Sequence, residues 1–220
     1  MKFTDNTVEV LKNFASINQN ILFEEGTEIA TVSPQRTVLA KAKLNEQIPQ
    51  EFAIYDLNRF LGYISRFNDP EYNFDADYVE IANDYKTGRY VFANATLIQS
   101  PPKKNLEVKD PEIAFDLQAA DLKEVLGDAA VLGLPEVAVE GTGGKIFLSA
   151  IDSKDDSSDR TRIEVGKTGD KEFRMIFKTE NFKMLERDYA VLISMKGISH
   201  FSSNDVEYFI ATEKNSTYDT

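Results

Sequence analysis

The segment that most resembles a nucleotide site is the glycine-rich run Gly141-Thr142-Gly143-Gly144-Lys145. A phosphate-binding loop needs a Ser or Thr directly after its lysine and a helix behind it. Here Ile146 follows the lysine, the glycine spacing differs, and residues 145–148 (Lys-Ile-Phe-Leu) are typical of a strand. The run therefore predicts a hairpin turn.

Two further features could bind or react, and neither fits a known site. An EF-hand calcium loop needs Gly at its sixth position and Glu at its twelfth, but the acidic stretch 152–159 has Ser157 and Ile163 there. We expect a solvated loop. His200, which we place in a loop, has no nucleophile or acid at a recognisable spacing. With no cysteine and one histidine, the chain predicts no enzyme, no metal site and no cofactor.

The composition indicates a folded, soluble, cytoplasmic protein. The 220 residues suffice for one large domain or two small ones, and 42% of them are apolar. No apolar run has the length of a membrane span, and the first residues lack the apolar core of a signal peptide. The net charge of −12 argues against a protein that binds nucleic acid through its overall charge.

One order of elements occurs twice: helix, strands, strand followed by helix, strands. Residues 51–61 and 172–185 both have the pattern of a short strand followed by a helix, and amphipathic helices at 4–17 and 119–132 precede them. The later strands and the turn signals of the first half complete the pattern. These strands are 78–82 and 89–97 in the first half and 189–195 and 206–212 in the second, with turns at 24–26 and 86–88.

A proline-bearing stretch separates the two halves. Residues 99–111 contain three prolines and alternating charges, which cannot hold a regular element. We therefore predict a domain at 1–98, a connector at 99–111 and a second domain at 112–220. The predicted fold class is α+β, with antiparallel sheets and two helices in each domain.

The predicted helices, at 4–17, 56–67, 119–132 and 179–187, each have an apolar stripe and basic residues on the open face. Arg59 and Arg66 lie seven residues apart, opposite the apolar stripe of their helix. In the third helix, Glu124 and Asp128 share the open face with the lysine. Exposed charges of this kind usually just face water, so composition alone does not identify a DNA-binding surface. The basic residues in question are Lys12, Arg59, Arg66, Lys123, Lys183 and Arg187.

Several short motifs carry a family resemblance. They are residues 11–15 (Leu-Lys-Asn-Phe-Ala), 53–58 (Ala-Ile-Tyr-Asp-Leu-Asn), 60–62 (Phe-Leu-Gly) and 68–69 (Asn-Asp), with Thr161-Arg162 and Lys183-Met184 in the second half. Together with the length and the connector, they resemble the sliding clamps of T-even-type bacteriophages, which are DNA polymerase processivity factors. The resemblance spans essentially the whole chain. It implies a ring of three subunits, with helices lining the hole and sheets forming the outer wall.

The resemblance also implies how the ring holds DNA. Duplex DNA would pass through the hole without base-specific contacts, and by family position the six basic residues named above would face it. A ring that is topologically linked to DNA needs few phosphate contacts, since tight binding would slow its sliding. An acidic chain is therefore compatible with this function.

The implied partners are a DNA polymerase, an ATP-dependent clamp loader and, for some clamps, late-transcription factors, all in the cytoplasm of the infected host cell. A C-terminal polymerase peptide would enter an apolar pocket near the connector, lined by Val32, Leu106 and Phe209; alternatively, Val32 and Phe209 are ordinary core residues. Exposed edges at 89–97 and 161–165 would pair between subunits. The alternative function is a non-enzymatic peptide-binding scaffold that does not encircle DNA.

Overall fold

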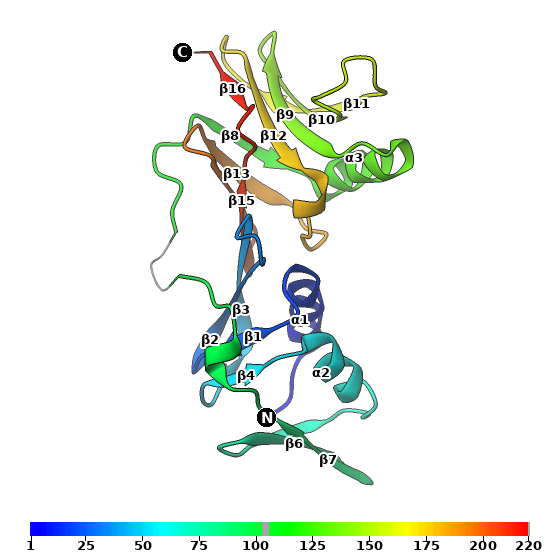
Figure 1. The fold of residues 1–220 in the computed structure, drawn as a ribbon, viewed down its shortest axis with the longest axis vertical. Coiled ribbons are helices and arrows are strands. Elements are labelled where there is room, and N and C mark those ends of the chain that lie inside the picture. The colour runs from blue at the N-terminus through cyan, green and yellow to red at the C-terminus, as the bar shows by residue number, and fades with distance from the viewer. Residues whose placement is uncertain (103–105, 220) are drawn as a thin grey trace. The chain divides into compact units, whose positions relative to one another are not determined.

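The computed structural model describes residues 1–102 and 106–219, and the chain divides into two compact units, Met1–Lys104 and Asn105–Thr220 (Figure 1). Each unit combines helix with antiparallel strands, so the predicted α+β class is confirmed. The division falls within the predicted connector 99–111, of which residues 103–105 lie outside the described residues. The boundaries at 98 and 112 stay predictions.

The first unit contains two helices and several small antiparallel sheets. Strand β1 pairs with β4, β2 pairs with β3, and β5, β6 and β7 form a sheet with β7 at one edge. The elements are α1 (Asp5–Ile17), β1 (Ile21–Phe23), β2 (Gly26–Val32), β3 (Val38–Ile48), β4 (Phe52–Ile54), α2 (Leu57–Ile64), β5 (Glu71–Phe74), β6 (Tyr78–Asn83), β7 (Lys86–Val91) and the 3₁₀ turn η1 (Ala95–Leu97).

Side-chain caps start both helices of this unit. The Thr4 hydroxyl accepts a hydrogen bond from the Thr7 N–H at 3.3 Å, and the Asp56 carboxylate accepts one from the Arg59 N–H at 2.9 Å. Such caps satisfy N–H groups that have no partner within the helix. The apolar stripes of α1 and α2 are buried, and the two helices contact each other.

The second unit contains two antiparallel sheets and the helix α3. One sheet has the strand order β11-β10-β9-β12-β16, and α3 packs against its first three strands; in the other, β8, β13, β14 and β15 pair in that order. The elements are β8 (Ile113–Leu117), α3 (Ala119–Leu132), β9 (Glu136–Thr142), β10 (Lys145–Ile151), β11 (Thr161–Lys167), β12 (Phe173–Lys178), the 3₁₀ turn η2 (Thr179–Asn181), β13 (Tyr189–Ser194), β14 (Ile198–Ser202), β15 (Val206–Ala211) and β16 (Thr217–Tyr218).

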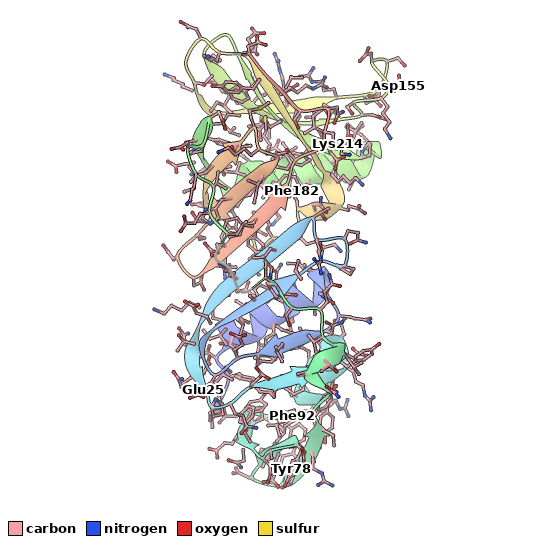
Figure 2. All side chains as sticks on the ribbon, turned by 60° about the vertical axis from the view of Figure 1, so that its left-hand side comes forward. Glu25, Tyr78, Phe92, Asp155, Phe182 and Lys214 are labelled. Atoms are coloured by element: carbon pink, nitrogen blue, oxygen red, sulfur yellow. The ribbon has the colours of Figure 1, made fainter. Side chains whose placement is uncertain are left out.

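The two motifs that mimic ligand sites have structural roles. Gly143 and Gly144 have φ values of 58° and 77° and connect β9 to β10, which confirms the predicted hairpin turn. The acidic stretch 152–159 is a loop between β10 and β11, with Asp155 in its protruding part (Figure 2). Within the described ranges, no three acidic or histidine side chains are grouped as a metal site would require.

The predicted helix at 179–187 is wrong. Only η2 forms there, because tertiary contacts engage the backbone beyond it. The Leu185 N–H donates to the Tyr208 hydroxyl at 3.1 Å, and the Tyr189 hydroxyl donates to the Leu185 carbonyl at 2.7 Å. These bonds replace the i to i−4 bonds that a helix would make. Among its described residues, the second unit thus has one α-helix, α3, where two were predicted.

Two other local predictions are corrected. The strand expected at 89–97 ends at Val91, since the Asn94 side chain accepts a hydrogen bond from the Thr96 N–H at 3.0 Å and starts η1. His200 lies in β14 and not in a loop.

The turn expected at 86–88 is part of β7. Glycine is required here because the Tyr63 side chain packs against the strand: a Cβ at position 88 would lie 1.9 Å from the Tyr63 hydroxyl.

No helix among the described residues is long and apolar enough to cross a membrane.

Candidate nucleic-acid interface

The first unit presents basic side chains on its two helices. Lys12 on α1 and Arg59 on α2 are both exposed, on the sides of their helices away from the buried stripes. Because α1 and α2 lie side by side (Figure 1), the two cations belong to one helical layer. That these two side chains face DNA stays a prediction.

Arg66 lies outside the helix on which it was predicted. Helix α2 ends at Ile64, and the Arg66 N–H donates to the Tyr63 carbonyl in the turn that follows. The Arg66 side chain is exposed, and its carbonyl accepts a hydrogen bond from Lys86 Nζ at 3.4 Å. Lys86 Nζ also lies 3.9 Å from the centroid of the Phe67 ring.

Lys86 is thus a further cation at the end of α2, which sequence reasoning missed. The contact joins residues 20 positions apart, so no local pattern indicates it. The sequence offers only the presence of a lysine at this position. Because residues 86–88 are interpreted as a turn from the sequence, Lys86 is not counted among the basic surface residues.

In the second unit, two of the predicted cations contact Glu186, one through its carboxylate and one through its backbone carbonyl. Lys123 on α3 donates to both carboxylate oxygens of Glu186, at 3.0 and 2.9 Å, and Arg187 Nη1 donates to the Glu186 carbonyl at 3.2 Å. Lys183 is exposed in the same non-helical segment. This segment also caps α3, because the Ala119 N–H donates to the Asp188 carboxylate at 2.8 Å.

This surface carries less net positive charge than the sequence pattern indicates. The Lys123–Glu186 pair is well exposed, with 68% and 61% of the two side chains accessible, and an exposed pair contributes little to stability. Its main effect is to neutralise the lysine. Exposed carboxylates lie on α3 at Glu124 and on α1 at Asp5 and Glu9, so it is the direct pairing of Lys123 that makes the helices of the first unit the stronger candidate for phosphate contacts.

The predicted peptide pocket draws on residues of both units, and each is placed here within its own unit. Val32 is buried and pairs with Leu39 of β3. Leu39 alternates along β3 with the core residues Val38 and Ala40 and shares its face with Lys41. Val32 and Leu39 therefore form an apolar pair on the face of the strands opposite the core.

In the second unit, Phe209 has a similar position. It is 4% exposed and alternates with Tyr208 and Ile210, which are fully buried in the core. Its ring stacks on His200 with centroids 4.3 Å apart and an interplanar angle of 6°. His200 Nε2 in turn lies 2.8 Å from a carboxylate oxygen of Glu207.

Leu106, the third predicted pocket residue, is half-buried in the segment before β8. The alternation described above places Val32 and Phe209 on the other face of their strands from the neighbouring core side chains, but both are themselves buried, at 5% and 4% exposed. The alternative that they are ordinary core residues therefore stays open. Whether the three side chains share one pocket stays a prediction.

Comparisons with known proteins match both units. A family model described as "DNA polymerase processivity factor" matches residues 4–86, and one described as "gp45 sliding clamp, C terminal" matches residues 114–214. The sliding clamp of Vibrio phage KVP40 is 36% identical over 97% of this chain and 99% of its own length. That of Enterobacteria phage T4 is 30% identical over the full length of both.

Solved structures show the same fold at low sequence identity. A chain of the PCNA2–PCNA3 complex from Sulfolobus tokodaii aligns with a TM-score of 0.70 and 14% identity, covering 97% of this chain and 98% of the other. The Helicobacter pylori β clamp bound to a DNA ligase peptide aligns with a TM-score of 0.72 and 12% identity, covering 97% of this chain and 65% of the other.

Proposed function

Because this chain belongs to the phage sliding-clamp family of DNA polymerase processivity factors, we propose that three copies of it close into a ring around duplex DNA. A sliding clamp is a non-catalytic scaffold, so the protein is not an enzyme. It acts on DNA together with a polymerase. The proposal concerns the assembly, the surfaces that carry it and the further partners.

The observation that carries the ring is the pair of sheet edges at β7 and β11. Each is a terminal strand of its sheet, one in the first unit and one in the second. A terminal strand offers unpaired N–H and C=O groups to another chain. Because the two edges differ, a contact between β7 of one copy and β11 of the next is heterologous, and such contacts form a ring when the rotation between copies closes.

Exposed apolar side chains near these edges support the same contact. Val91 at the end of β7 is 65% exposed, and Val131 on α3, which packs against β11, is 86% exposed. Exposed apolar side chains that form a contiguous patch mark sites of protein association, and Leu132 beside Val131 is also 41% exposed.

Inside the ring, the helices would face DNA. Lys12, Arg59 and Arg66 of the first unit supply most of the phosphate contacts, and Lys123, Lys183 and Arg187 of the second unit supply weaker ones because the Glu186 carboxylate is paired with Lys123. Contacts to phosphates carry no sequence information, so the ring can slide.

The further partners follow from the family. A C-terminal peptide of the polymerase occupies the pocket lined by Val32, Leu106 and Phe209, an ATP-dependent clamp loader opens the ring, and late-transcription factors bind the closed ring. The clamp acts in the cytoplasm of the infected host cell.

Light scattering over a dilution series tests the ring. We expect a mass three times the 24.8 kDa of one chain at micromolar concentration. Polymerase extension of a long primed template, with the clamp loader present, is the second measurement. A protein that stays at 24.8 kDa and does not stimulate synthesis would instead be a peptide-binding scaffold that does not encircle DNA.

A further inference from the structure

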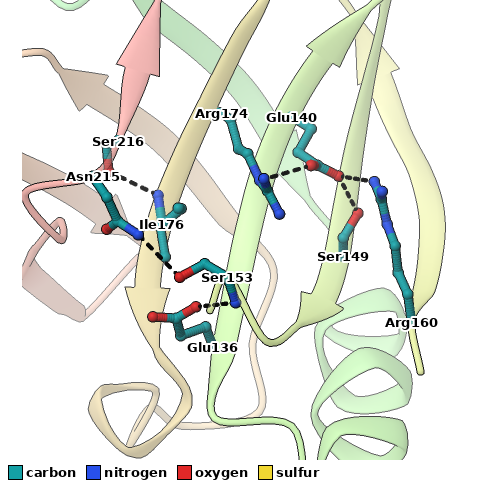
Figure 3. Close-up of polar contacts among 9 residues, drawn as sticks. All are labelled: Glu136, Glu140, Ser149, Ser153, Arg160, Arg174, Ile176, Asn215 and Ser216. Atoms are coloured by element: carbon teal, nitrogen blue, oxygen red, sulfur yellow. Dashed lines mark hydrogen bonds and ion pairs between the residues drawn. The ribbon is translucent and has the colours of Figure 1, made fainter. Parts of the chain in front are cut away.

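A buried carboxylate on the middle strand of one sheet joins three neighbouring strands of the second unit. Glu140 on β9 is 9% exposed, and its Oε1 lies 3.2 Å from Arg174 Nε on β12 (Figure 3). Its Oε2 accepts hydrogen bonds from Ser149 Oγ on β10 at 2.6 Å and from Arg160 Nη2 at 2.5 Å. Arg160 directly precedes the edge strand β11.

A second buried carboxylate of β9 fixes the start of the loop that joins β10 to β11, the loop that ends at Arg160. Glu136 is 8% exposed and accepts a hydrogen bond from the Ser153 N–H at 2.8 Å. Ser153 Oγ in turn accepts one from Asn215 Nδ2 at 2.9 Å (Figure 3). The loop from β10 to β11 is thus fixed to β9 at both ends, while Asp155 in between is exposed.

Stability alone is a weak explanation for this network. Burying a charged carboxylate has a large desolvation cost, and well-packed apolar residues are often as stabilising as a buried ion pair. The best-attested benefit of such a pair is that it specifies one arrangement of the chain. Here the specified element is the start of β11, because Arg160 is the residue before Thr161 and its side chain is 45% exposed at the sheet edge.

We propose that Glu140, acting through Arg160, is a positioning residue that holds β11 ready to pair with a second copy of this chain. The proposal rests on the ring described above. An edge strand that is already ordered loses little conformational entropy on association, whereas a strand that orders only in the complex reduces the affinity by that cost. Glu140 thereby raises the affinity between subunits without contacting the partner.

The two arginines of the network provide a matched comparison. Arg160 and Arg174 contact the same carboxylate, but Arg174 lies on β12, on the other side of β9 from β11. Both Arg160→Gln and Arg174→Gln remove one cation from Glu140 and should lower the free energy of unfolding. Only Arg160→Gln should loosen the start of β11.

The experiment uses the full-length protein and each variant. We expect Arg160→Gln to raise the concentration at which the ring dissociates at least tenfold more than Arg174→Gln does, as measured by light scattering on dilution. Amide hydrogen exchange of residues 161–167, measured at concentrations where the protein is monomeric, should quicken in Arg160→Gln only. Because monomers have no partner, this exchange separates positioning from a direct contact between subunits.

Two further variants test whether the effect passes through Glu140. Adding Glu140→Gln to Arg160→Gln should cause little further loss of ring affinity, since the pair is already broken. Arg160→Lys, which keeps the charge, should restore part of the affinity and also serves if Arg160→Gln folds poorly. Additive losses would overturn the role of Glu140.

The outcomes distinguish this inference from the ring itself. A parent protein that never exceeds the mass of one chain would overturn the ring and the inference together. A parent ring that responds equally to both arginine variants, with unchanged exchange in β11, would overturn only the positioning role.

Discussion

Lys123 Nζ on α3 lies 2.9 Å from a carboxylate oxygen of Glu186, a residue 63 positions later in the chain. The sequence predicts a helix at Glu186, but the segment is irregular and lies against the N-terminal end of α3. The helical surfaces of the two units are therefore unequal. In the first unit the exposed residues Asp5 and Glu9 share α1 with Lys12, whereas in the second unit a carboxylate pairs directly with Lys123.

This pairing leads to a prediction for Glu186→Gln. Removing the carboxylate frees Lys123 to contact a phosphate, so the clamp should bind short duplex DNA more tightly, and the slope of log affinity against log salt should steepen by about 1. Fluorescence anisotropy at several salt concentrations measures both quantities. Glu180→Gln is the control, because Glu180 is also exposed and lies in η2. Equal effects of the two variants would show that Lys123 does not face DNA.

A charge reversal tests the helical layer of the first unit. Arg59→Glu combined with Arg66→Glu should reduce clamp-dependent synthesis on long templates, because both side chains are exposed and would repel phosphates. Folding should be unaffected, since exposed substitutions change the free energy of unfolding by about 0.5 kcal/mol or less. Lys214→Glu, at an exposed position near the C-terminus, is the control. Full processivity in the double variant would contradict a DNA-facing role for these arginines.

The elements that the sequence predicts well are those with local signals. Helix α1 has its cap at Thr4, and α3 ends where Gly133 adopts a φ of 69°, so both bounds follow from nearby residues. The same holds for the hairpin at Gly143. The exposure of Lys12 and Arg59 follows from the helical period in the same way.

The predictions that failed depend on contacts distant in sequence. Phe182 and Leu185 have helical spacing, but the Tyr208 hydroxyl, 23 residues away, binds the Leu185 N–H and no helix forms. Gly88 reads locally as a turn and in fact makes room for Tyr63. The pairing of Lys123 with Glu186 is likewise invisible to any local pattern. The predicted fold class stays correct despite such errors, whereas the predicted charge of a surface changes with each of them.

The buried tyrosines predict a loss of stability in alkali. Burial raises the pKa of Tyr208 to about 12, and burial also raises the pKa of Tyr189. In the unfolded chain these hydroxyls ionise near pH 10, so between about pH 10 and 12 the unfolded state loses protons that the folded state keeps. Each tyrosine should therefore lower the free energy of unfolding by about 2 to 3 kcal/mol across this range.

Urea unfolding followed by circular dichroism from pH 9 to 12 measures this dependence. Tyr208→Phe should flatten the decline, although it also loses the hydrogen bond from Leu185, worth about 1 kcal/mol at every pH. Tyr85→Phe should leave the decline unchanged, because Tyr85 is 79% exposed. An equally steep decline in Tyr208→Phe would assign the alkaline transition to other groups.

The last prediction concerns the polymerase peptide, whose binding we expect to be apolar. Leu106 is half-buried and Phe209 lies on the face of β15 opposite the core, so a charged residue at either position should weaken binding of a polymerase C-terminal peptide more than tenfold, about 1.4 kcal/mol. Salt should change the affinity of the parent protein little, since screening acts on charges and not on apolar contacts. Isothermal titration calorimetry at low and high salt measures both effects.

The controls separate lost binding from lost folding. Leu97→Asp changes a leucine that is 64% exposed in η1 and should leave peptide affinity unchanged. Phe209→Asp also breaks the stack on His200, so circular dichroism must accompany its titration, and Phe209→Leu, which keeps an apolar side chain, should bind with an intermediate affinity. If a folded Leu106→Asp protein bound the peptide normally and the parent affinity fell steeply with salt, the site would be electrostatic and would lie elsewhere on the clamp.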